Sequence, residues 1–63
     1  MKVAVMYFPG CEPDEIALTF QNKQIAVRWA KSHCEENGTK SFDLLWGKKF
    51  YPYYKYGGKW YLR

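Results

Sequence analysis

The sequence lacks several features that would place it in a common class of protein. It has two cysteines, Cys11 and Cys34, which are too few for a disulfide scaffold and favour free thiols in a reducing compartment. A single bridge between them remains open at this level. No apolar run approaches the length of a membrane span, and residues 1–10 lack the small-residue pattern of a cleaved signal peptide. We therefore expect a cytoplasmic protein with no membrane contact.

Residues that carry catalysis are also scarce and unsuitably spaced. The chain has one histidine, His33, which directly precedes Cys34. A Cys–His nucleophile would need Cys11 to reach His33 across the fold, and a zinc site on these three residues would lack a fourth ligand and CxxC-type spacing. The acidic residues between positions 12 and 15 are typical of a solvated loop, and no phosphate-binding glycine loop is present. We expect no enzymatic activity, no cofactor and no metal.

Acidic residues are absent from the last twenty positions, where aromatic residues are concentrated. Residues 44–63 hold eight of the thirteen aromatic residues and five basic residues, whereas residues 1–43 hold five basic and six acidic residues. The formal net charge of +4 is thus the sum of a body at −1 and a C-terminal segment at +5. A chain of 63 residues forms one small domain, with room for one core and one working surface. This segregation indicates that the C-terminal segment carries the working surface.

Hydrophobic periodicity predicts a single α+β domain, residues 1–63, with the element order β-β-α-β-β-β. One helix is expected to pack on one face of a mostly antiparallel sheet. The predicted strands span residues 2–8, 15–20, 41–46, 50–56 and 59–63. A helix that begins at Pro13 competes with the second strand, but alternating apolar residues between positions 16 and 20 favour the strand. The first strand is apolar on both faces, which is typical of a position inside the sheet.

The predicted helix spans residues 23–36, with Asn22 as N-cap and Gly38 in the stop signal. Its apolar stripe consists of Ile25, Ala26, Trp29, Ala30 and Cys34, and leaves Val27 outside. Trp29 is then the largest anchor, and its replacement by Ala is expected to cost about 3–5 kcal/mol.

A two-residue Gly57-Gly58 loop between aromatic runs predicts a C-terminal hairpin and fixes its register. Pro52 suggests a bulge or a free edge in the fourth strand. Alternation then separates the hairpin residues into two sets. The set assigned to the core is Tyr51, Tyr53, Lys55, Trp60 and Leu62. The set assigned to an open sheet face is Pro52, Tyr54, Tyr56, Lys59, Tyr61 and Arg63.

The open set suggests a binding surface, because tyrosine rings can stack on unpaired bases and nearby cations can hold phosphates. The candidate residues are Tyr54, Tyr56, Lys59, Tyr61 and Arg63, with Lys48 and Lys49 of the preceding turn adding positive charge. The expected partner is nucleic acid or an acidic protein surface. A protein-binding inhibitor or adaptor could use the same face or the edge of the fifth strand. The plan is also common among short virus-encoded proteins that inhibit a host protein. A homodimer through the open face and a merely solvated sheet face are the remaining alternatives.

Overall fold

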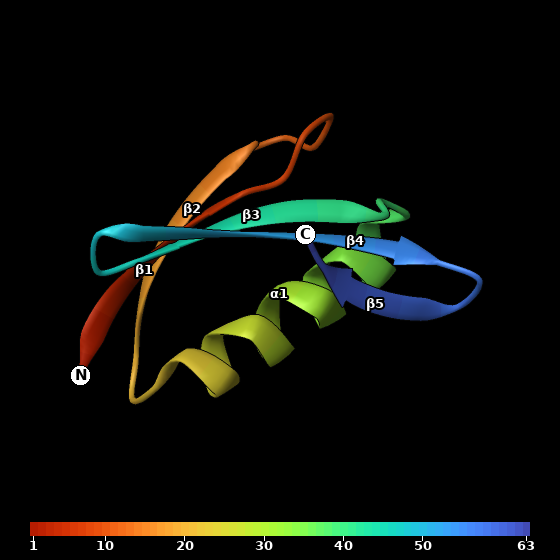
Figure 1. Ribbon diagram of the computed structural model, residues 1–63. Coiled ribbons are helices and arrows are strands. Elements are labelled where there is room, and N and C mark those ends of the chain that lie inside the picture. The colour runs from red at the N-terminus through yellow and green to blue at the C-terminus, as the bar shows by residue number, and fades with distance from the viewer.

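The computed structural model describes all 63 residues and confirms the predicted α+β domain. Five strands form one antiparallel sheet, and one helix packs against one side of it (Figure 1). The elements are β1 (Lys2–Tyr7), β2 (Glu15–Phe20), α1 (Lys23–Asn37), β3 (Ser41–Trp46), β4 (Lys49–Tyr56) and β5 (Lys59–Leu62). The competing helix at Pro13 is wrong, because residues 15–20 pair with β1 as a strand. The first strand ends one residue earlier than predicted, and Phe8 lies buried just beyond it.

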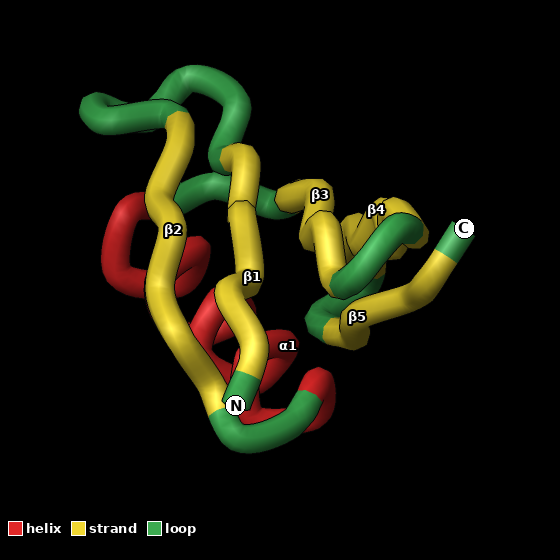
Figure 2. The backbone as a smooth tube through the Cα atoms, turned by 90° about the vertical axis from the view of Figure 1, so that its left-hand side faces the viewer, coloured by secondary structure: helices red, strands yellow, loops and turns green.

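The sheet has the strand order β2-β1-β3-β4-β5 (Figure 2). The first strand therefore lies inside the sheet, as predicted from its two apolar faces. All neighbouring strands are antiparallel, and the registers are continuous from Ser41↔Tyr54 to Trp46↔Lys49 in the β3–β4 pair. With one helix on one side, the other side of the sheet has no covering element. We call that side the open face.

The ends of α1 follow from the residues that flank it. The Asn22 side chain accepts a hydrogen bond from the backbone N–H of Ile25 at 3.0 Å, which satisfies a donor that the first turn leaves unpaired. Gly38 adopts a left-handed conformation with φ of 72°, and its N–H bonds to the carbonyl of Cys34. The helix thus ends at Asn37, one residue later than predicted, because Gly38 is the first residue to leave the helical conformation.

The hydrophobic core lies between α1 and the central strands β1 and β3. Its ten buried residues are Ala4, Met6, Phe8, Phe20, Ala26, Val27, Ala30, Cys34, Phe42 and Leu44. The face of the helix that packs on the sheet is therefore rotated relative to the predicted apolar stripe. Val27 is buried, whereas Ile25 is 37% exposed and Trp29 is only half-buried. The small side chains of Ala26 and Ala30 face the sheet and allow a close approach, so Trp29 lies at the edge of the core against Phe8 and Phe20.

Pro52 lies in β4 without a bulge, so the predicted bulge is wrong, whereas the predicted free edge agrees with the end of β5 at Leu62. It pairs with Asp43 of β3, and its carbonyl accepts a hydrogen bond from the backbone N–H of Arg63 at 2.9 Å. Because the N–H and C=O of a strand residue point to the same side, the missing donor of Pro52 falls on the β5 side. There β5 has already ended at Leu62, so no ladder hydrogen bond inside the sheet is lost.

Candidate binding surfaces

The C-terminal hairpin has the predicted register. Tyr56 pairs with Lys59 and Tyr54 with Tyr61 across the Gly57-Gly58 loop, whose two residues both have positive φ. Tyr54 and Tyr61 stack across the strands, with ring centroids 5.5 Å apart and planes at 28°. The guanidinium carbon of Arg63 lies 5.2 Å from the centroid of the Tyr54 ring. The structure therefore brings Tyr54, Tyr61 and Arg63 together on the open face.

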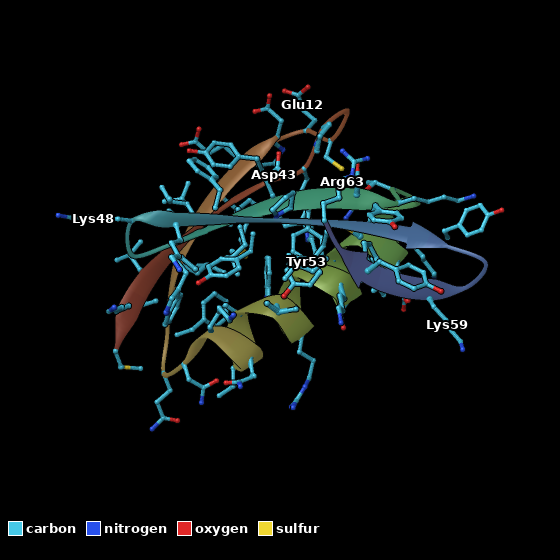
Figure 3. The ribbon with its side chains drawn as sticks, in the orientation of Figure 1. Glu12, Asp43, Lys48, Tyr53, Lys59 and Arg63 are labelled. Carbon is cyan, nitrogen blue, oxygen red and sulfur yellow. The ribbon has the colours of Figure 1, made fainter.

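The other candidate residues lie apart from this cluster. Tyr56 and Lys59 are exposed at the tip of the hairpin, and the Tyr56 side chain is 76% exposed. Lys48 extends from the opposite end of β4 (Figure 3). Lys49 was predicted to lie in a turn, but it belongs to β4 and pairs with Trp46, which places it on the helix side of the sheet. The loop is only Gly47-Lys48, because Gly47 takes a positive φ of 67° and permits a tight turn.

The predicted core set of the hairpin is only half-buried. Tyr53 stacks on the buried Phe42 with centroids 5.1 Å apart, and Trp60 packs on Phe42 at 5.4 Å. Lys55 donates to Glu35 at 3.2 Å, the one ion pair in the protein. The assignment of Leu62 to the core is wrong, because its side chain is 50% exposed. Leu62 belongs to the edge strand β5, which α1 does not reach.

The structure adds an apolar row to the open face that the sequence reasoning missed. The pairings Val5↔Ala17, Val5↔Leu45 and Leu45↔Phe50 align these side chains across four strands. Phe50 is 60% exposed, and its ring lies 6.2 Å from that of Tyr7. The second apolar face of β1 was a usable signal for this row. Alternation along the predicted strand also places Phe50 on the same face as Pro52 and Tyr54. Its pairing with Leu45 depends on the two-residue turn, where the sequence had predicted a turn of three residues.

Charges on the open face are balanced. Lys59 and Arg63 lie on it, but the registers also place Glu15 and Asp43 there. Asp43 and Arg63 both lie above the sheet, whereas Tyr53 lies below it, between sheet and helix (Figure 3). Neither Asp43 nor Arg63 forms an ion pair. The strong positive charge of the C-terminal segment is therefore divided between the two sides of the sheet, because the side chains of each strand alternate.

The structure describes the surroundings of the two cysteines and His33, which were considered for catalysis. Both cysteines are free, so the bridge that the sequence left open is not formed. Burial raises the pKa of the Cys34 thiol, which disfavours the reactive thiolate, and its sulfur lies 3.7 Å from the carbonyl of Ser41. His33 stacks on Trp29 with centroids 5.1 Å apart. No three His, Cys, Asp or Glu side chains are grouped as metal ligands would be.

The 15-residue helix lacks the length and the apolar character that crossing a membrane requires. Comparisons with protein-family models, with curated protein sequences and with solved structures found no match. The function is therefore inferred from the geometry of the surfaces described above.

Proposed function

We propose that this is a non-enzymatic binding protein whose open face binds a protein partner. The observation that carries this proposal is the uncovered apolar row that runs through Phe50 and continues into exposed aromatic side chains. On this face Val3 is 57%, Phe50 60% and Tyr61 42% exposed. Contiguous apolar surface of this kind on a small protein is typical of an interaction site.

The composition of the open face supports a protein partner. Tyrosine, phenylalanine and arginine are enriched in the centres of protein interfaces, where lysine and glutamate are depleted. The centre of the open face is apolar, and its cations, Lys59 and Arg63, lie toward the β5 side. Arg63 has no carboxylate partner of its own. A fitting partner would present an apolar centre with a carboxylate positioned near Arg63.

Nucleic acid is the second candidate for this face, and it is favoured by the cluster of Tyr54, Tyr61 and Arg63. A base could stack on Tyr61 while Arg63 and Lys59 contact phosphates. The balanced charge of the face weighs against this candidate, because phosphate neutralisation dominates nucleic-acid affinity. The ring of Tyr54 is also already contacted by both Tyr61 and Arg63. Nucleic-acid binding at the open face stays a prediction.

Affinity capture from nuclease-treated extract, with Phe50→Ser as the test variant, examines the proposal. Ile25→Ser is a matched control, because Ile25 is another exposed apolar residue but lies on the helix. We expect the wild type and Ile25→Ser to recover one stoichiometric protein. Phe50→Ser should weaken the reconstituted complex by about tenfold or more, the usual effect of truncating a central aromatic anchor.

Two results would overturn the proposal, and a third would identify the partner. Equal capture by both variants would show that the open face is not the interface. A ligand removed by nuclease would favour the nucleic-acid alternative. Light scattering that finds a dimer in the wild type and a monomer in Phe50→Ser would identify the partner as a second copy of this chain.

A further inference from the structure

A groove between α1 and β4 lies on the other side of the sheet from the open face. It has a volume of about 370 Å³. Its lining residues are Lys23, Gln24, Val27, Arg28, Lys31 and Tyr53. Three of these six carry a positive charge and none is acidic. The groove exists because α1 packs on β1, β2 and β3 but stays clear of the backbone of β4.

Two of the three cations are held in place by tyrosine rings. The Nζ atom of Lys23 lies 4.0 Å from the centroid of the Tyr51 ring, and that of Lys31 lies 5.6 Å from the centroid of Tyr53. Both lysines are half-buried. A cation–π contact orients an ammonium group without neutralising it, because the ring has no net charge and accepts no proton. The groove therefore presents ordered positive charges.

None of the three cations has a counterion within the protein. The one ion pair joins Lys55 to Glu35, and no hydrogen bond engages the side chains of Lys23, Arg28 or Lys31. The charges along α1 also run against the helix dipole. The cations lie in its first nine residues, whereas its last turn contains Glu35 and Glu36 and no basic residue. The field of the helix thus adds to that of the cations and strengthens the attraction for anions.

We propose that this groove binds the phosphate backbone of a nucleic-acid strand. The step from Lys23 to Lys31 extends about 12 Å along the helix, comparable to the rise of three or four nucleotides of one strand at about 3.4 Å each. A row of cations along a groove matches a row of phosphates better than it matches a single anion. The groove and the open face lie on opposite sides of the sheet, so each can bind its ligand independently of the other.

Fluorescence anisotropy with labelled single-stranded DNA and RNA tests the proposal through two triple variants of equal charge. One variant, K23Q/R28Q/K31Q, removes the cations of the groove. The control, K2Q/K40Q/K48Q, removes three cations that lie outside the groove and outside the open face. We expect the groove variant to lose about tenfold or more in affinity. The slope of log affinity against log salt concentration should become shallower by about two, because each of the three lost phosphate contacts contributes about 0.7 to it. The control should change affinity by less than about threefold.

Equal losses in the two variants would show attraction by net charge alone and would overturn the proposal. A larger loss in the control would also overturn it and would place the site outside the groove. Absence of wild-type binding at about 50 mM salt would have the same consequence. Circular dichroism checks the fold of each variant.

Arg28→Gln alone provides a second test that disturbs no aromatic contact, since Arg28 is exposed and lies over no ring. This variant should bind more weakly, and the slope of its log affinity against log salt concentration should become shallower by about 0.7.

Discussion

The region around α1 and the terminal hairpin β4–β5 differ sharply in how they are packed. Every fully or nearly buried residue lies between Ala4 and Leu44, whereas β4 and β5 contain none. The helix packs on the first three strands, and the hairpin attaches mainly through its pairing with β3 and through Tyr53 and Trp60 on Phe42. The packing that stabilises the fold therefore lies mostly outside the hairpin, and we expect most hairpin side chains to tolerate substitution without unfolding of the protein.

A matched pair of phenylalanines tests this separation and has the largest expected effect. Phe8 is 0% exposed and Phe50 is 60% exposed. Phe8→Ala should cost about 3–5 kcal/mol because it leaves a cavity in the core, which a domain this small can scarcely tolerate. Phe50→Ala should stay within about 0.5 kcal/mol of the wild type. Urea denaturation measures both, and similar costs would remove the distinction between the two regions.

The Gly57-Gly58 loop is the part of the hairpin whose backbone has positive φ. Gly58 has a φ of 80°, and a Cβ atom there would meet no atom within 4 Å. The cost of Gly58→Ala should therefore come from the backbone alone, at about 1–2 kcal/mol. Gly57→Asn is the control, since Asn tolerates this conformation in such turns. Thermal unfolding measures both, and an unchanged stability in Gly58→Ala would contradict the observed turn.

The Tyr54–Tyr61 pair should contribute less to the stability of the fold than the loop glycines. Cross-strand aromatic pairs add about 0.2–1 kcal/mol relative to Ala–Ala, and both rings are partly exposed. A double-mutant cycle of Tyr54→Ala and Tyr61→Ala should return a coupling energy in that range. A much larger coupling would show that these side chains are structural, which would weaken their assignment to a binding surface.

The smallest expected effect concerns Cys34 and pH. Burial raises the pKa of its thiol above the ordinary value of 9.0, so the folded protein keeps a proton that the unfolded chain loses. The resulting stability is complete below pH 9.0 and decreases as the pH rises toward the pKa of the folded state. Urea denaturation at neutral pH and at about pH 10 measures how much stability each protein loses between the two pH values. This loss should be smaller in Cys34→Ala than in the wild type. Cys11→Ala is the control, because it removes a thiol outside the core. If stability decreased equally with pH in all three proteins, the effect could not be assigned to the Cys34 thiol.

The sequence predicted the order of the elements and the hairpin register because local signals determine both. Alternating apolar residues identify the strands, and Gly57-Gly58 permits only one tight register. The rotation of the helix was not predictable from its apolar stripe. Which residue faces the sheet depends on how closely α1 approaches it, and Ala26 and Ala30 permit an approach that buries Val27 and leaves Trp29 half-buried. Trp29→Ala should therefore cost less than Phe8→Ala, and less than the value expected from the sequence.

The candidate surfaces were predicted only in part, for a related reason. Pairing within the hairpin placed Tyr54, Tyr61 and Arg63 together correctly. The apolar row through Phe50 depends on the β1–β3 pairing, which joins strands far apart in the sequence. The balancing carboxylate of Asp43 lies on β3, which is not adjacent to β5 with Lys59 and Arg63. The cationic groove likewise requires the position of α1 relative to β4. Such nonlocal arrangements leave little trace in a single sequence.

The strand order β2-β1-β3-β4-β5 also has a kinetic consequence. Every neighbouring pair except β1–β3 is consecutive in the chain, so that pairing alone must close a loop of about 35 residues. Forming it is therefore expected to limit the folding rate, while β4 and β5 join a nucleus that already exists. Stopped-flow measurements should find that Leu44→Ala slows folding and Tyr61→Ala mainly speeds unfolding. The hairpin would then be the part of the sheet that assembles last and opens first.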